Sequence, residues 1–441
     1  MALTPRDAFI EASVWHGSLE KAQAILAANP EIGSSDIHVA AILGDEVSVG
    51  RFLAVDRANA TAKSGPLEWD ALTHLCFSRF LRLDKARSDG FVGAAAALLD
   101  AGANANTGFF DMDHKPTPEW ESALYGAAGV AHHAALTRLL IERGADPNDE
   151  EVPYHAPETH DNDALKVLVE SGRLTADNLS IMLLRKADWH DHDGIKYLLE
   201  HGADPNRMTR WGYTALHQAL RRDNALKNLE VLLDHGADPI LQGRRDGLSA
   251  ASIAVRRGRG DVLALLERRG VTVQWHGVEA LIAACASDDA ARVGAIAIRD
   301  PSLVHDVLAA GGRLLAEFAG TANAEGVGHL LDLGVDVAAR YEGDGYFDIA
   351  KDSTALHVAA WKAWPGVVTL LIARGAPVNV PDGQGRTPLA LAVKACVDSY
   401  WTARRSPASV EALLSAGAST GGVLFPSGYK EVDDLLRPHV K

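Results

Sequence analysis

The segment Leu198-Leu199-Glu200-His201-Gly202-Ala203-Asp204-Pro205-Asn206 returns along most of the chain with small changes. Close copies begin at Leu139 and Leu232, and shorter ones begin at Leu98, Leu370 and Leu413. Paired leucines are typical of a helix that faces a core, and the glycine after them supplies a left-handed residue that ends the helix. The segment therefore predicts a helix followed by a tight turn, repeated many times.

A second pattern opens the repeating units, as in Thr214-Ala215-Leu216-His217-Gln218-Ala219 and Thr354-Ala355-Leu356-His357-Val358-Ala359. The threonine is a favourable helix cap, and the alanines allow neighbouring helices to approach closely. Together the two patterns resemble the ankyrin repeat, which has a period of ~33 residues and a Thr-Pro-Leu-His-x-Ala signature. The resemblance extends from about residue 4 to about residue 420 and implies an all-α solenoid of about twelve helix–turn–helix units.

We expect residues 1–441 to form a single ankyrin-repeat solenoid with distinct regions. A capping repeat is expected at residues 1–34, and repeats with an enlarged linker (78–90) and an enlarged finger (109–120) at 35–148. Central repeats with a degenerate consensus and a polar concave face follow at 149–240, and further repeats at 241–420. The latter contain a second enlarged, β-hairpin-like finger (340–352) and an insertion (398–407), and residues 421–441 are expected to cap the end.

Composition narrows the function. The formal net charge of −15 argues against a nucleic-acid partner, because such proteins depend on clustered lysine and arginine. Three distant cysteines (Cys76, Cys285 and Cys396) indicate a reducing compartment and no thiolate metal site. The start of the chain lacks a signal-peptide pattern, and no apolar stretch reaches the ~18 residues of a membrane span. A cytoplasmic protein with no membrane partner is therefore expected.

The central repeats depart from the consensus. Counting from the capping threonine, the fifth and eighth positions of each unit are expected on the concave side, one helical turn apart. In the third to seventh repeats these positions and the adjoining finger carry polar and aromatic side chains, as a ligand surface would. The predicted binding residues are His74, Asp111, His114, Trp120, Tyr154, His160, Arg185, Trp189, Trp211, Gln218 and Arg221.

Two functions fit this surface. The leading prediction is a binding protein that recognises a partner protein or ligand in the concave groove, with arginine and tryptophan contributing most of the affinity. The alternative is an enzyme or a small-molecule or carbohydrate receptor. There His155 or Glu158 would act as general base, Asp188 or Asp113 as its acidic partner, and Arg185 would neutralise an anion. A closed pocket and shifted pKa values would favour the alternative.

The same residues also have structural interpretations. Arg185 and Asp188 could form an ion pair in the groove wall, Lys186 could be a buried amine, and about half of the aromatic side chains could belong to the core. A metal site formed by His160, His190 and His192 is a further hypothesis, but no firm ligand spacing supports it. We therefore predict no metal and no cofactor.

Overall fold

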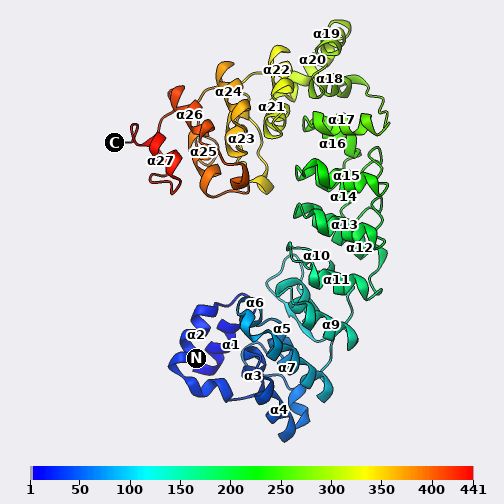
Figure 1. Ribbon diagram of the computed structural model, residues 1–441, viewed down its shortest axis with the longest axis vertical. Helices are drawn as coiled ribbons and strands as arrows, with labels where there is room; N and C mark the ends of the chain where they lie inside the picture. The colour runs from blue at the N-terminus through cyan, green and yellow to red at the C-terminus, as the bar shows by residue number, and fades with distance from the viewer. Residues whose placement is uncertain (1–2, 441) are drawn as a thin grey trace. The chain divides into compact units, whose positions relative to one another are not determined.

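The computed structural model describes residues 3–440 of the chain. It contains 27 α-helices within those residues, and they divide between two compact units, shown together in Figure 1. The first unit extends to Asp238 and includes Gly243–Arg245, and the second consists of Pro239–Gln242 and the chain from Asp246 onward. Each unit is a stack of helix pairs.

The first unit holds fifteen of these helices and one hairpin. The helices are α1 (Pro5–Ser13), α2 (Leu19–Ala28), α3 (Ile37–Leu43), α4 (Glu46–Val55), α5 (Ala71–Cys76), α6 (Arg79–Leu83), α7 (Ser88–Ala101), α8 (Ala123–Tyr125), α9 (Ala134–Glu142), α10 (Glu151–His155), α11 (Asp163–Glu170), α12 (Ala176–Asp188), α13 (His192–Glu200), α14 (Ala215–Arg221) and α15 (Leu226–Asp234). The two strands are β1 (Gly108–Asp111) and β2 (Glu119–Ser122).

The second unit contains helices and short 3₁₀ turns. The helices are α16 (Ala250–Arg256), α17 (Gly260–Arg268), α18 (Gly277–Ala286), α19 (Ala290–Arg299), α20 (Pro301–Ala309), α21 (Gly311–Gly320), α22 (Ala324–Asp332), α23 (Ala355–Trp361), α24 (Pro365–Ala373), α25 (Pro388–Val397), α26 (Ala408–Ser415) and α27 (Lys430–Leu436). The helix α27 lies within residues 421–441, where the sequence predicts a cap.

The two repeated motifs form the predicted local structures. Thr387 caps α25 by accepting a hydrogen bond from the Ala390 amide at 3.2 Å. After α13, Gly202 adopts the left-handed conformation with φ 93°, which ends the helix without the steric cost of a Cβ atom. Leu198 and Leu232 are fully buried. The all-α repeat architecture expected from the sequence is therefore confirmed.

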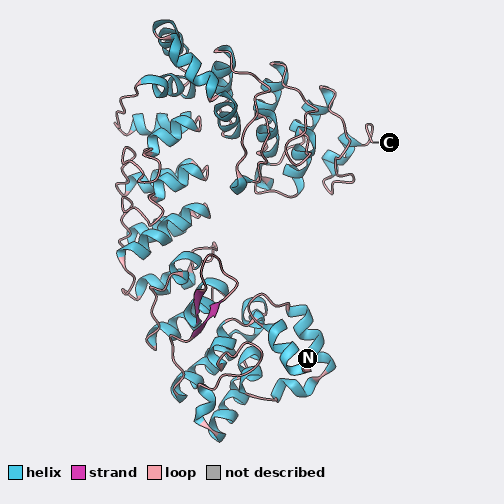
Figure 2. Ribbon diagram, turned by 180° about the vertical axis from the view of Figure 1, so that it is seen from behind, coloured by secondary structure: helices cyan, strands magenta, loops and turns pink. Residues whose placement is uncertain are grey.

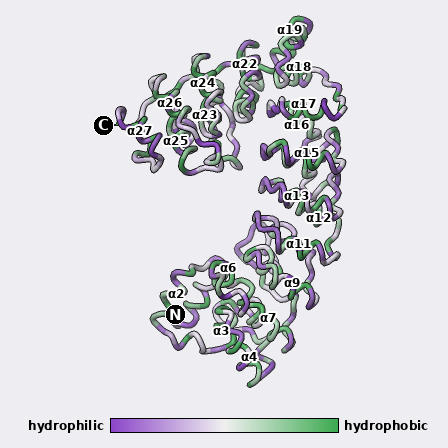
Figure 3. Tube along the Cα trace, in the orientation of Figure 1, coloured by the Kyte–Doolittle hydropathy of each residue, from purple (hydrophilic) through white to green (hydrophobic). Residues whose placement is uncertain are grey.

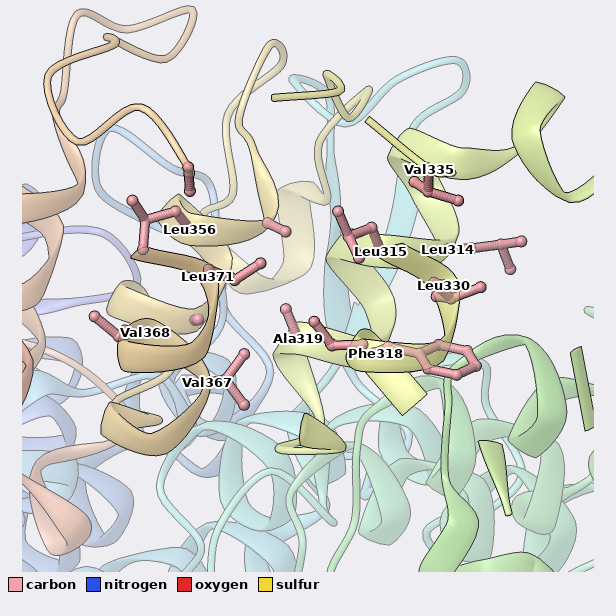
Figure 4. Close-up of a cluster of buried hydrophobic side chains, with 14 of the residues drawn as sticks. Leu314, Leu315, Phe318, Ala319, Leu330, Val335, Leu356, Val367, Val368 and Leu371 are labelled. Carbon is pink, nitrogen blue, oxygen red and sulfur yellow. The ribbon is translucent and has the colours of Figure 1, made fainter. Parts of the chain in front are cut away.

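Most helices mix hydrophilic and hydrophobic residues along their length, as Figure 3 shows, so each buries one stripe against its neighbours. In the second unit, Leu314, Leu315 and Phe318 of α21 pack with Leu330 of α22 and Leu371 of α24 in one continuous core (Figure 4). A helix pair alone lacks a partner for this apolar stripe, so stacking of repeats supplies it.

The finger at 340–352 and the insertion at 398–407 pack together in the second unit. The Phe347 ring lies 6.0 Å from the Trp401 ring, and the Trp361 indole donates a hydrogen bond of 2.5 Å to the Phe347 carbonyl. These side chains belong to a second, smaller apolar cluster that also includes Tyr341. Two departures from the repeat consensus thus stabilise each other.

Helix α20 (Pro301–Ala309) is an addition that the repeat pattern does not predict. Asp300 caps it by accepting a hydrogen bond from the Ser302 amide at 3.2 Å, and Pro301 occupies the first helical position. The helix contacts α18, α19 and α21. This repeat therefore has three helices where its neighbours have two.

Candidate functional site

The enlarged finger of the first unit is a β-hairpin with two unlike faces. Strands β1 and β2 appear as the magenta pair in Figure 2, and they are antiparallel, with Phe109 opposite Glu121 and Phe110 opposite Trp120. Residues directly opposite each other in such a pair share a face. The Phe109 ring stacks on Trp69 at 4.0 Å, so Phe109 and Glu121 face the repeats. Phe110 and Trp120 face solvent.

The face toward the repeats is acidic. Asp111 lies opposite Glu119 on this face, and Glu121 follows one pleat further along. Like charges directly opposite each other destabilise a strand pair, and a hairpin normally turns its apolar residues inward. This hairpin turns three carboxyl groups inward together with Phe109, and it leaves the large apolar side chains Phe110 and Trp120 outward.

Glu121 is the most perturbed of these carboxyl groups. Its side chain is 5% exposed, and its Oε2 atom has no hydrogen-bond partner among the described residues. Burial, together with the charges of Glu151, Asp111 and Glu119, raises the pKa of Glu121 to about 8. A hydrogen bond with Glu151 raises the pKa of Glu119 as well. The hairpin and α10 thus gather carboxyl groups that repel one another.

Aromatic rings border this acidic face. The Trp15 ring lies 5.5 Å from Phe109 and 6.0 Å from Tyr125, in both cases edge to face. Trp15 is held in place because its amide donates a hydrogen bond of 3.0 Å to the Phe77 carbonyl. Trp15 and Phe109 are half-buried, so part of each ring is open to solvent. Carboxyl groups and aromatic faces therefore occupy one side of the hairpin.

The enlarged linker at 78–90 supports this arrangement. It folds into α6, a short 3₁₀ turn and the start of α7. The Phe80 ring lies 6.2 Å from Phe9 of α1. The linker therefore packs against the first repeat and brings Trp15 toward the hairpin.

His155 of α10 joins the hairpin to the central repeats. Its Nε2 atom lies 2.9 Å from a Glu151 oxygen, and its Nδ1 atom lies 2.8 Å from a Glu158 oxygen. Burial lowers the pKa of His155, but the two carboxylate hydrogen bonds outweigh it and raise that pKa to about 9. His155 is therefore an imidazolium at neutral pH, with both nitrogens engaged.

Gly129 allows α10 to pack closely against Tyr125. A Cβ atom at Gly129 would lie 2.6 Å from the Tyr125 ring and 2.9 Å from the His155 Cβ atom. Both distances are too short for a real side chain. The Tyr125 and His155 rings consequently approach to 5.1 Å.

Charged side chains continue the network across α12 and α14. The Arg185 guanidinium pairs with Glu158 and with Asp188, and it lies 4.1 Å above the Tyr154 ring. Gln218 donates a hydrogen bond of 2.6 Å to Asp188, and Arg222 donates one of 2.8 Å. The predicted residues His155, Glu158, Arg185, Asp188, Tyr154 and Gln218 are therefore contiguous, and the ion-pair interpretation of Arg185 and Asp188 describes their geometry.

Other predicted residues lie around this network. Trp211 lies 5.7 Å from the Tyr154 ring, Arg221 lies over Tyr213 at 4.3 Å, and His114 lies 2.9 Å from Glu119. Trp189 contacts His160 at 6.1 Å. Asp113 is exposed. Within the described part of the chain, no hydrogen bond joins its side chain to these residues.

His74 does not line a surface, which corrects the prediction. Its ring is fully buried and lies 5.3 Å from that of His38. Its Nδ1 atom bonds to the Asp70 carbonyl, and its Nε2 atom has no hydrogen-bond partner among the described residues. The fifth position of this unit lies between two packed helices, α3 and α5, so the side chain is enclosed.

The buried His74 predicts a loss of stability in acid. Burial lowers its pKa from 6.5 to about 3, so the unfolded chain binds the proton first. The stability that neutral His74 contributes is thus present above about pH 6.5 and is lost as the pH falls toward 3. The free energy of unfolding should fall between pH 7 and pH 4.5 in both the native chain and His74→Gln. We expect this fall to be about 2 kcal/mol smaller in His74→Gln. Urea titrations at both pH values measure this, and equal losses would contradict it.

The three histidines of the metal hypothesis do not form a site. Within residues 3–440 no group of three His, Cys, Asp or Glu side chains is placed to hold a metal ion. His190 has a φ of 53° in the turn between α12 and α13, and burial lowers its pKa. His192 begins α13. The three side chains thus belong to different parts of two neighbouring repeats.

Lys186 is buried and paired, as one of its interpretations requires. Its Nζ atom lies 2.8 Å from Asp191 and donates to the Thr159 carbonyl at 2.5 Å. Asp191 also accepts a hydrogen bond of 2.8 Å from Asn162 and caps α13. The bonds to Thr159 and Asn162 link this pair to the preceding repeat.

Several residues of the site were missed from the sequence. They are Trp15, Glu119, Glu121, Tyr125, Glu151 and Arg222. One signal was available, because Glu119-Trp120-Glu121 alternates in the pattern of a strand, which places Glu119 and Glu121 on one face. No local pattern indicates Trp15, which reaches the site through tertiary packing.

Comparison with known proteins agrees with the architecture. The family model of ankyrin repeats (many copies) matches residues 183–225, and the ankyrin repeat model matches residues 211–244 and 351–383. Among solved structures, the human ASB11 ankyrin repeat domain is similar at 23% identity with a TM-score of 0.26, over 60% of this chain and 96% of that one. None of the helices described here is both long and apolar enough for a membrane crossing. The repeated motifs, the stacked helix pairs and the segments matched by the two family models support an ankyrin-repeat family.

Proposed function

We propose that this chain binds a partner protein through the outer face of its hairpin and the adjoining central repeats. Ankyrin repeats generally mediate protein–protein interaction. The observation that supports this particular surface is the exposure of three large apolar side chains on one finger. Phe110 is 57% exposed, Met112 67% and Trp120 37%.

The exposed side chains are held in a defined arrangement. The Phe110 and Trp120 rings form a cross-strand pair 4.9 Å apart, with an angle of 64° between their planes. Ordered aromatic side chains of this kind contribute most of the affinity at many interfaces. The exposed Asp113 follows Met112 in the chain, so we expect a partner with an apolar patch bordered by lysine or arginine.

Acid–base catalysis fits the geometry less well. A general base needs a free nitrogen or oxygen, and both nitrogens of His155 are bonded to carboxylates. Burial raises the pKa of Glu158, yet the bonds to His155 and the charge of Arg185 lower it overall. These groups form a closed set of ion pairs, which is better suited to holding repeats 5–7 in place than to accepting protons.

The proposal predicts that Trp120→Ala weakens partner binding by about 30-fold, the effect of losing an aromatic residue that anchors an interface. A photo-crosslinking amino acid at Met112 would identify the partner, and calorimetry with the purified partner would then measure the affinity. Val47→Ala provides the matched control, because Val47 is also exposed in the first unit and lies on α4. Equal affinity of the Trp120→Ala variant and the native chain would overturn the proposal.

A further inference from the structure

We infer that the inner face of the hairpin is a binding site for an organic cation, a guanidinium or alkyl-ammonium group, with the Glu121 carboxylate as its counterion and the Trp15, Phe109 and Tyr125 rings as its walls. The inference rests on the proposed function where the cation belongs to the partner protein. It concerns the opposite face of the same hairpin.

The Glu121 carboxyl group is the first reason. The Glu121 side chain is only 5% exposed, and its Oε2 atom has no hydrogen-bond partner among the described residues. An unpaired buried carboxyl oxygen costs free energy, so the fold carries a cost here that a ligand with N–H donors would remove. Because Glu121 is opposite Phe109, this oxygen lies on the face that meets the aromatic rings.

Local charge is the second reason. The groups that face Glu121 are Asp111 of β1, Glu119 of β2, and Glu151 and His155 of α10. His155 is already bonded to Glu151 and Glu158, so it does not neutralise Glu121 directly. The surrounding field therefore favours a positive ligand.

The aromatic walls select the kind of cation. Trp15 lies edge to face with both Phe109 and Tyr125, so the three rings form one aromatic cluster that begins at the inner face of the hairpin. Aromatic faces attract an organic cation both by cation–π interaction and by contact with its alkyl chain. A metal ion would instead need several oxygen or nitrogen ligands, and no suitable group of three occurs in the described part of the chain.

Binding should release a proton. Burial, together with the carboxylates named above, raises the pKa of Glu121 to about 8, so this group is mostly protonated at pH 7 in the free chain. A guanidinium or ammonium group stabilises the ionised form, which sends the proton to the buffer. We therefore expect about one proton released per cation bound at pH 7, and fewer at pH 9, where Glu121 is already ionised.

The test is calorimetry of the full chain with three probes. They are agmatine, the peptide acetyl-Ala-Arg-Ala-amide, and the same peptide with citrulline, which has the shape of arginine but no charge. We expect the cationic probes to bind and the citrulline peptide not to bind. Tighter binding of the peptide than of agmatine would assign the site to a partner's side chain, and the reverse would assign it to a free amine.

Variants identify the residue responsible. Glu121→Gln should weaken cation binding by at least about tenfold and abolish the proton release, because it keeps the shape of the protonated acid but cannot ionise. Glu142→Gln is the control, since Glu142 is exposed on α9. Trp15→Leu should weaken binding about threefold.

Measurements of thermal stability show whether Glu121→Gln is folded, so a loss of binding can be told apart from a loss of structure. Because the pKa of Glu121 is higher in the folded chain, its favourable contribution is present below about pH 4.5 and is lost as the pH rises through 8. Glu121→Gln should therefore melt about 3–6 °C above the native chain at pH 8.5 and close to it at pH 5. No binding of either cation by the native chain, or unchanged binding by Glu121→Gln, would overturn the inference. Because agmatine needs no partner protein, either result is independent of the Trp120→Ala experiment.

Discussion

Asp191→Asn is expected to lower the free energy of unfolding by about 3–5 kcal/mol, because it leaves the Lys186 ammonium buried without a counterion. Lys186 is fully buried, and its Nζ atom lies 2.8 Å from the Asp191 carboxylate. Burial lowers the pKa of Lys186, and the pairing with Asp191 opposes that effect. Asparagine retains a side-chain oxygen that can cap α13, but its amide group then faces the Lys186 and Asn162 donors, so the variant removes the charge and the two hydrogen bonds accepted there.

A second substitution separates the buried charge from the helix cap. Lys186→Met combined with Asp191→Asn should regain most of the lost stability, since an apolar side chain of similar length fills the same space without a charge. Urea unfolding followed by circular dichroism measures both variants, and hydrogen exchange of α12 and α13 shows where the loss occurs. If the double variant were as unstable as Asp191→Asn, the buried charge would not be the cause.

Phe318→Ala is expected to destabilise the second unit by about 3–5 kcal/mol, the usual cost of removing a buried phenyl ring from a packed core. Phe318 is fully buried in α21, within the cluster of Figure 4. Gly258 and Gly326 pack on the two sides of its ring, where a Cβ atom at either position would come within 2.7 Å. Backbone that approaches this closely has little freedom to close the cavity.

Two matched variants test that explanation. Phe318→Leu should cost less, because it leaves a smaller cavity. Ile298→Ala should change the free energy of unfolding by no more than about 0.5 kcal/mol, since Ile298 is exposed on α19 in the same unit. Hydrogen exchange should show faster opening of α21 and α22 in Phe318→Ala. A loss equal to that of Ile298→Ala would show that the ring contributes little.

Asp191→Asn and Phe318→Ala lie in different units, so their losses of stability need not sum to one loss for the whole chain. Repeat arrays unfold in segments whose stability depends on the nearest neighbours. Asp191→Asn should therefore mainly affect the exchange of the first unit, and Phe318→Ala that of the second.

Local sequence predicted part of the candidate site. The degenerate central repeats pointed to Tyr154, His155, Glu158, Arg185 and Asp188, and these residues do lie together. They were predicted as site residues because they replace small or apolar residues of the repeat consensus. Spacing alone did not show that His155 lies between two carboxylates, since Glu151 precedes the degenerate motif and is one helical turn away.

His74 illustrates the opposite case. A histidine at a nominal concave position suggested a binding surface, yet the packing of α3 and α5 encloses it beside His38. Exposure depends on the crossing angle and spacing of neighbouring helices, and a position number within the repeat does not specify either. Arg222 was missed for the same reason, because the neighbouring Arg221 occupied the expected position while Arg222 reaches Asp188.

The sequence by itself determined the architecture of this protein, because most repeats carry their own apolar stripe and many carry a cap or a helix-ending glycine. Those signals are local, so they can be read within a few residues. Only the tertiary structure decided the composition of the hairpin site. Trp15, Glu121 and Glu151 come from three separate segments, and their proximity arises from the stacking of repeats and from the strand register that turns Glu121 inward. Contacts between repeats depend on packing at long range, which no single repeat encodes.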